Sequence, residues 1–283
     1  MTLGRHDVAE IDLTGKIAIV TGGGRGLGRS MTLALTNAGA SVAAAMHIAE
    51  DAEKISADCA DLPGKVIPII ADIRNPEECK RVVEETNEKL GGVHILVNNA
   101  GVGMLLVSDS FTRIPTKFWE VDVDTWRRII DTNFNGAFQM AREVVPHFLA
   151  QGWGRIVNVT TSVHTMQRQG FSPYGSSKAA FEAATSSWAG DLDGTGVTVN
   201  ILIPGGAADT NLLPGNPGDP GRSGADGKLI DPVVMRAPVV WLASKHANGV
   251  NGQRFIGNEW NTDLEPEQCI ENAAGPVGFA PRP

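Results

Sequence analysis

Six short apolar runs, separated by longer amphipathic stretches, most restrict the folds open to this chain. Such runs are typical of strands buried on both faces of a parallel sheet, and a 3.6-residue apolar period is typical of helices packed against it. Strands are expected at 16–21, 41–46, 66–71, 94–98, 155–160 and 197–202, and helices at 27–38, 76–90, 123–151 and 174–192. Their alternation predicts βαβ units. The expected fold class is therefore α/β, a single Rossmann-type doubly wound parallel sheet with helices on both faces.

The length and composition fit one soluble domain over residues 1–283. A chain of 283 residues buries roughly three quarters of its extended surface, enough for a core without disulfides or metals. The three cysteines are odd in number and lack a Cys-x-x-Cys pair, so we expect a reducing, cytoplasmic setting and no metal site. A net charge of -8 argues against a nucleic-acid partner. No apolar run reaches the ~18 residues of a membrane span.

Two segments interrupt the alternation of strands and helices. Residues 206–231 are rich in Gly and Pro and follow the sixth expected strand. A loop of this length in a compact domain is usually functional or disordered. We interpret it as a substrate lid, with a mobile surface excursion as the alternative. The C-terminal tail, 260–283, has little periodicity, so it is expected either to close a subunit contact or to fray.

A glycine-rich turn follows the first expected strand, with the sequence Thr21-Gly22-Gly23-Gly24-Arg25-Gly26-Leu27-Gly28. Glycines let the backbone turn tightly and approach a pyrophosphate, while the helix that follows presents its N-terminal amides to the anion. Its place between the first strand and the first helix therefore favours a dinucleotide site over a merely flexible turn. The spacing is not G-x-G-x-x-G, because no triplet of these glycines satisfies it.

The end of the second expected strand, residues 45–47, lacks the carboxylate that binds the ribose 2′-hydroxyl in many NAD sites. Its absence removes a repulsion that would exclude a 2′-phosphate, and Arg25 and His47 could supply positive or donating groups. The sequence therefore favours NADP(H) over NAD(H). Glu50 and Asp51 lie close enough in the chain to weaken this preference.

Tyr174 is the only tyrosine of the chain, and Lys178 follows it by four residues. On a helix these positions share one face, so the lysine ammonium can lie beside the phenol and stabilise the phenolate. A free tyrosine titrates near ~10, so a positive neighbour would bring the phenol into range for acid–base chemistry near neutral pH. Taken alone, the pair would equally suit a surface tyrosine beside a solvated lysine.

Three motifs together resemble the classical short-chain dehydrogenase/reductase family: Thr21-Gly22-x-x-x-Gly26-x-Gly28, Asn98-Asn99-Ala100-Gly101 and Tyr174-x-x-x-Lys178. The resemblance runs from about Leu13 to Trp260, with Asp72, Asn133 and Pro204-Gly205 as further matches. It implies an NAD(P)(H)-dependent oxidoreductase that interconverts a carbonyl and a secondary alcohol by hydride transfer, with Tyr174 as proton donor or acceptor. Asn98 itself we interpret as a buried amide that ties strands together.

The resemblance also implies where each part of the cofactor would bind. The pyrophosphate would lie on the glycine turn, the adenine on Asp72 and the Ile73 amide, and the nicotinamide near Pro204 and Gly205. Lys178 would hold the nicotinamide ribose and lower the pKa of the phenol. The full implied cofactor-binding set is Gly22, Gly24, Arg25, Gly26, Leu27, Gly28, His47, Asp72, Ile73, Asn99, Ala100, Gly101, Tyr174, Lys178, Pro204, Gly205 and Thr210.

The implied catalytic set contains Tyr174, Lys178, Asn133 and a hydroxyl that polarises the substrate carbonyl. In this family the hydroxyl belongs to a serine thirteen residues before the tyrosine, and the same count here reaches Thr161. A one-residue shift in the loop would present Ser162 instead, so both residues stay open. Asn133 would keep a water in a proton path behind Lys178.

The expected partner is a small-molecule carbonyl or alcohol, and no nucleic acid or membrane. Apolar walls for its pocket are suggested by Met104, Leu105, Leu106, Phe171, Leu212, Leu213, Leu229 and Ile230. The resemblance further implies a homodimer or homotetramer formed through the helices at 123–151 and 174–192. Two alternatives stay open: an epimerase or dehydratase of the same fold with a tightly bound cofactor, and a non-catalytic NADP-sensing protein.

Overall fold

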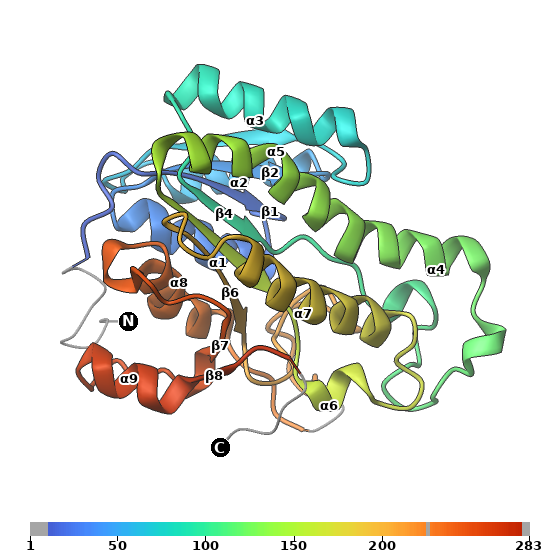
Figure 1. Ribbon diagram of the computed structural model, residues 1–283. Coiled ribbons are helices and arrows are strands. Elements are labelled where there is room, and N and C mark those ends of the chain that lie inside the picture. Colours follow the sequence, from blue (N-terminus) through green and yellow to red (C-terminus); the bar gives the residue numbers. More distant parts are fainter. Residues whose placement is uncertain (1–10, 225–226, 279–283) are drawn as a thin grey trace.

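The computed structural model describes residues 11–224 and 227–278, and an eight-stranded sheet forms its centre (Figure 1). The strands are β1 (Ile17–Thr21), β2 (Ser41–Met46), β3 (Val66–Ile70), β4 (Ile95–Asn98), β5 (Gly154–Val159), β6 (Val197–Ile203), β7 (Gln253–Ile256) and β8 (Ala274–Pro276). Their order is β3-β2-β1-β4-β5-β6-β7-β8; β8 pairs antiparallel with β7, and the other pairs are parallel. The strand order reverses between β1 and β4, where doubly wound sheets bind ligands. The predicted fold class is confirmed.

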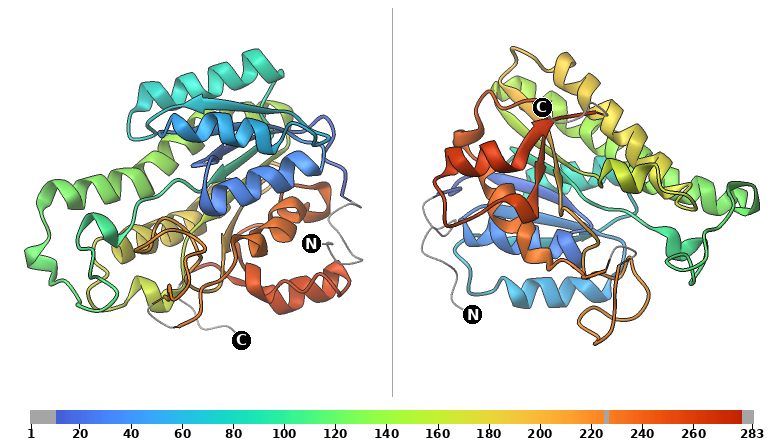
Figure 2. Two further views of the ribbon diagram at one scale, coloured as in Figure 1. Left: turned by 180° about the vertical axis from the view of Figure 1, so that it is seen from behind. Right: turned by 90° about the horizontal axis from the view of Figure 1, so that it is seen from below.

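Helices cover both faces of the sheet (Figures 1 and 2). They are α1 (Gly26–Asn37), α2 (Glu50–Asp58), α3 (Pro76–Leu90), α4 (Val123–Ile130), α5 (Gly136–Gln151), α6 (Val163–Met166), α7 (Tyr174–Asp191), α8 (Arg236–Leu242) and α9 (Pro266–Ala273). Strand side chains alternate between two cores: in β1, Ala18 and Val20 pack with α1 and α8, whereas Ile19 packs with α3 and α5. The near-continuous apolar strands of the sequence are explained by burial on both faces.

The helix predicted at 123–151 is present, but it is not uniform. α4 ends at Ile130, the backbone then makes a π-helical turn (Asp131–Asn135), and α5 begins at Gly136. Single π-helical turns inside α-helices are frequent at functional sites. This one contains Asn133, which is fully buried. The six predicted strands and the other three predicted helices lie within a residue or so of their expected ends.

Residues 266–276 of the C-terminal tail form regular structure, although their sequence shows little periodicity. α9 packs Cys269 and Ala273 in buried positions, and β8 extends the sheet beyond β7. Elements of eight and three residues are too short to show a period in the sequence, and their stability comes from packing against distant segments. The fraying alternative is therefore wrong for this stretch, while residues 279–283 lie outside the described ones.

The cysteines act as packing groups. All three are free and buried, and burial raises the pKa of the Cys79 thiol to about 12. Across 11–224 and 227–278, no three His, Cys, Asp or Glu side chains gather in a way that could hold a metal ion. In the same residues, we find no helix with the length and apolar character needed to span a membrane.

Candidate active site

A cavity of about 910 Å³ lies at the carboxyl ends of the parallel strands, the edge that the strand order predicts. Most of the residues expected from the sequence line it: Gly22, Gly24, Arg25, Gly26, Leu27, His47, Asp72, Ile73, Asn99, Ala100, Gly101, Thr161, Ser162, Tyr174, Lys178, Pro204, Gly205 and Thr210. Gly28 and Asn133 do not line it and lie behind its wall. The fold therefore brings the candidate cofactor-binding and catalytic residues together in one site.

The glycine turn closes tightly before α1. A Cβ atom at Gly28 would lie 2.0 Å from the carbonyl oxygen of Gly22, so only glycine allows this approach. α1 begins without a side-chain cap and without an acidic residue in its first turn. Its first residues, Gly26 and Leu27, border the cavity. Uncapped amides and the positive end of the helix dipole suit an anion, so this turn fits a pyrophosphate group.

Two asparagines at the end of β4, Asn98 and Asn99, connect the strands around the site. The Thr21 hydroxyl accepts hydrogen bonds from the backbone amides of Asn99 and Ala100, each at 3.0 Å, and the Asn99 side chain donates to the Thr21 carbonyl at 2.9 Å. The Asn98 side chain donates to Asn158 Oδ1 at 3.1 Å and to the Ala137 carbonyl at 3.3 Å. The interpretation of Asn98 as a buried amide that ties strands together agrees with these contacts.

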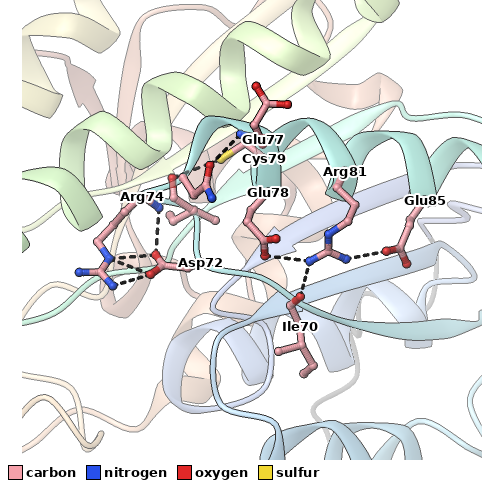
Figure 3. A network of polar contacts seen from close by, with 10 residues as sticks. Ile70, Asp72, Arg74, Glu77, Glu78, Cys79, Arg81 and Glu85 are labelled. Carbon is pink, nitrogen blue, oxygen red and sulfur yellow. Dashed lines mark hydrogen bonds and ion pairs between the residues drawn. The ribbon is translucent and has the colours of Figure 1, made fainter.

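Two arginine–aspartate pairs lie near the carboxyl ends of β2 and β3. Arg25 donates from Nε to Asp51 Oδ2 at 2.6 Å, and Arg74 Nε donates to both carboxylate oxygens of Asp72 at 2.9 Å (Figure 3). The hydrogen bonds from Arg74 are the largest cause that lowers the pKa of Asp72, and His47 lowers it further. Arg74 borders the cavity but was not identified from the sequence, although its position two residues after an aspartate is a signal for such a pair.

Tyr174 and Lys178 border the cavity from one face of α7, as their spacing predicts. The buried Lys178 ammonium donates to the Val159 carbonyl at 2.8 Å, and burial lowers the pKa of Lys178 to about 8. Burial raises the pKa of Tyr174 to about 12, while the Thr161 side chain, as a hydrogen-bond partner, lowers it. In the protein alone the loss of hydration is the largest influence on this pKa, and a lowering of the phenol pKa by Lys178 stays a prediction.

The hydroxyls of Thr161 and Ser162 have different partners, although both residues border the cavity. Ser162 is the N-cap of α6: its Oγ accepts from the Thr165 amide at 3.1 Å and lies 2.9 Å from Thr165 Oγ1. The Thr161 side chain is instead the hydrogen-bond partner of the Tyr174 phenol. This geometry favours Thr161 as the hydroxyl beside the phenol and gives Ser162 a capping role.

Asn133 fixes the loop that follows β4. Its Oδ1 accepts from the Val102 amide at 2.8 Å, and its Nδ2 donates to the Val102 carbonyl and to Ser177 Oγ, each at 3.0 Å. A Cβ atom at Gly101 would lie 3.2 Å from Asn133 Oδ1 and 3.7 Å from Lys178 Nζ. The amide and the ammonium are thus neighbours of Gly101. The Asn133 side chain is bonded to Val102 and Ser177.

The segment interpreted as a lid forms an apolar wall of the cavity. The large apolar residues of this segment that line the cavity are Leu212, Leu213, Leu229 and Ile230, and Met104 and Phe171 join them from elsewhere in the chain. The expectation that Leu105 and Leu106 belong to this wall is wrong, because neither borders the cavity. They belong to the 3-10 turn Met104–Leu106, in which only Met104 is buried.

Arg222 organises the lid from inside. Its side chain is only 7% exposed and forms an ion pair with Asp209. It donates to the carbonyls of Thr210 at 2.8 Å, Leu213 at 3.1 Å and Pro214 at 2.9 Å. One guanidinium therefore closes the loop between residues 209 and 222. Sequence reasoning missed Arg222, because nothing local in a Gly- and Pro-rich loop indicates which cation its carbonyls will surround.

Comparison with known proteins identifies the family. The profile of the short chain dehydrogenase family matches residues 16–217. The chain belongs to this family. Among its relatives, the 3-oxoacyl-[acyl-carrier-protein] reductase FabG of Thermotoga maritima is 31% identical over 246 residues, which cover 85% of this chain and 95% of that protein. The chloroplastic NADPH-dependent aldehyde reductase 2 of Arabidopsis thaliana is 33% identical over 271 residues, covering 87% and 93%.

The likeness extends to solved structures. A 3-ketoacyl-(acyl-carrier-protein) reductase from Brucella melitensis, complexed with NADH, superposes with a TM-score of 0.73 at 27% identity, covering 85% of this chain and 95% of that one. Membership of the short-chain dehydrogenase/reductase family confirms the reaction class and cofactor class that the motifs imply. The protein is an NAD(P)(H)-dependent oxidoreductase acting on carbonyl and alcohol groups, and the glycine turn before α1 fits such a cofactor.

Proposed function

We propose that Tyr174 is the proton donor and acceptor of this oxidoreductase, with Thr161 bonded to the substrate oxygen and Lys178 to the nicotinamide ribose. The observation that carries the proposal is the meeting of these three side chains at one wall of the cavity. When bound, the nicotinamide supplies or accepts the hydride. The protein then has to orient the carbonyl and to handle the proton at oxygen.

The raised pKa of Tyr174 suits the phenol to the role of proton donor in carbonyl reduction. At about 12, the phenol is fully protonated at neutral pH and can donate to the substrate oxygen as negative charge develops there. Thr161 would donate to the same oxygen. Alcohol oxidation requires the phenolate, which burial disfavours. Behind Lys178, a water held at Asn133 would return a proton to the phenol after turnover.

NADP(H) is the cofactor that the β2 end suits best. Residues 45–47, at the end of β2, include no carboxylate, and the exposed His47 borders the cavity. Arg25 Nε donates to Asp51, and among the described residues the two Nη groups of Arg25 have no hydrogen-bond partner, so they suit a 2′-phosphate.

We expect Arg25→Leu to lower the NADPH-to-NADH ratio of kcat/KM about tenfold. Asp51→Asn, which removes the opposing charge, should raise that ratio.

The remaining parts of the proposal concern the domain organisation, the lid, the cellular location and the oligomeric state. Residues 1–283 would form a single domain, and residues 206–231 would close over a small carbonyl compound with apolar groups. Buried, unpaired cysteines suit a cytoplasmic location. Exposed apolar side chains on α4 and α5 suit a homodimer or homotetramer formed through α4, α5 and α7.

The experiment is oxidation of NADPH, with NADH in parallel, across aldehydes, cyclic ketones and 3-oxoacyl thioesters. Native protein is compared with Tyr174→Phe, and NADPH binding is followed separately by fluorescence. We expect turnover to fall at least ~1000-fold in the variant while NADPH still binds. Turnover that survives the substitution would overturn the assignment of Tyr174.

A further inference from the structure

Glu182 is a buried carboxylate on the face of α7 that carries Tyr174 and Lys178. The three residues follow at intervals of four, so they form one row along the helix. Glu182 is fully buried. A buried carboxylate is costly unless it is paired and hydrogen-bonded, so its partners show what it holds.

Three separate segments meet on this carboxylate. Oε2 accepts from Thr160 Oγ1 at 3.0 Å, directly after β5. Oε1 accepts from Arg254 Nε of β7 at 2.9 Å, and from the Gly278 amide of the C-terminal segment at 3.1 Å. Gly278 lies two residues after the end of β8 and is the last residue of this segment that the structure describes. Glu182 therefore connects the C-terminal segment, residues 277–278 after β8, to Thr160 at the end of β5.

The row on α7 holds three consecutive residues at the end of β5. Lys178 donates to the Val159 carbonyl at 2.8 Å, Glu182 accepts from Thr160, and Tyr174 has Thr161 as its partner. Thr160 borders the cavity, but it is only 3% exposed, and its hydroxyl donates to Glu182. This bond restricts the backbone from which Thr161 projects into the cavity.

We propose that Glu182 is a positioning residue, which acts through Thr160 to place Thr161 beside Tyr174, and that the C-terminal segment completes this support. The proposal rests on the proposed function of Thr161 and Tyr174. A buried ion pair is by itself weak reason to infer added stability. The pair with Arg254 compensates the charge, while the bond to Thr160 has a geometric consequence at the site.

The sharpest test changes Thr160 and leaves Glu182 in place, because removing Glu182 would leave Arg254 buried without its partner. Thr160→Val keeps the shape and removes the bond, and Thr160→Ser restores it. We expect kcat to fall about tenfold to a hundredfold in Thr160→Val, since small misplacements of catalytic groups cost this much. KM should change less than about twofold, and Thr160→Ser should return to near-native kcat.

Thr198→Val is the matched control. Thr198 is also buried, on β6, and its Oγ1 has no partner among the described residues. The substitution is therefore chemically the same but touches no part of the row on α7. If Thr160→Val and Thr198→Val have equal kcat, or if Thr160→Ser does not recover, the proposal is overturned. Tyrosine-dependent turnover of the native protein would still support the proposed function in that case.

A second pair of variants tests the C-terminal segment. Deletion of 279–283 keeps the Gly278 amide, whereas deletion of 277–283 removes it. We expect only the longer deletion to lower kcat. Hydrogen exchange of the amides at 159–162 gives a readout that needs no turnover: exchange should quicken in Thr160→Val and in the longer deletion. Unchanged exchange in both would contradict the coupling even if no substrate were found.

Discussion

At the scale of single residues, Thr161 and Ser162 carry adjacent hydroxyls, and we expect their substitutions to affect different properties, activity for Thr161 and stability for Ser162. Thr161→Val should lower kcat about 100-fold, because it removes a donor to the substrate oxygen, and Thr161→Ser should retain most activity. Ser162→Ala should lower the free energy of unfolding by about 1 kcal/mol through the lost N-cap of α6, with little effect on kcat. Steady-state kinetics and urea unfolding of the three variants separate these roles. Loss of activity in Ser162→Ala alone would reverse the assignment.

Lys178 gives a second prediction at this scale, from the direction of its pKa. Burial lowers that pKa from 10.5 to about 8, so between these values the unfolded chain binds more protons than the folded one. The contribution of Lys178 therefore raises the free energy of unfolding as pH rises through this window. Below the window the ammonium is charged in both states, and the full cost of burying it lowers stability. Urea unfolding at pH 7.5 and pH 10 should show this gain in native protein but not in Lys178→Met. Parallel pH dependence in both proteins would contradict it.

At the scale of elements, the lid depends on Arg222. Replacing it by Met leaves Asp209 and three backbone carbonyls without their donor, so the loop between 209 and 222 should open. We expect KM for substrate to rise about tenfold with a smaller change in kcat, and faster proteolysis within this loop. Arg127→Met is the control, since its exposed pair with Asp124 contributes little. Native KM and native resistance to proteolysis in Arg222→Met would show that the lid does not need this guanidinium.

Elements with local signals could be predicted from the sequence. α3 has an N-cap at Asn75, Pro76 in its first turn and Gly91 in a left-handed conformation after its end, so its bounds were predicted correctly. The contacts that define the site join residues far apart in the chain. Glu182 meets Arg254 across 72 residues, and Arg25 meets Asp51 across 26. Spacing along one helix cannot reveal such partners, nor which of two adjacent hydroxyls faces a phenol.

At the scale of the whole molecule, one surface has apolar side chains that a monomer would leave in water. Phe138 on α5 is 47% exposed and its ring lies 6.5 Å from that of Trp188 on α7, while Val123 at the start of α4 is 60% exposed. On the same surface, α7 carries exposed small residues such as Ala183, which would allow a helix of another copy to approach closely. This surface therefore suits self-association through α4, α5 and α7.

Phe138→Glu tests that surface, because a carboxylate placed at the centre of a two-fold contact would face its own copy and be desolvated without a partner. We expect native protein to elute as a dimer or tetramer in light-scattering chromatography and the variant to shift toward the monomer. Val233→Glu, at a similarly exposed apolar position outside these helices, should keep the native assembly. A monomeric native protein, or an unchanged assembly in Phe138→Glu, would exclude this contact. If the variant is monomeric yet fully active, the cavity is complete within one chain.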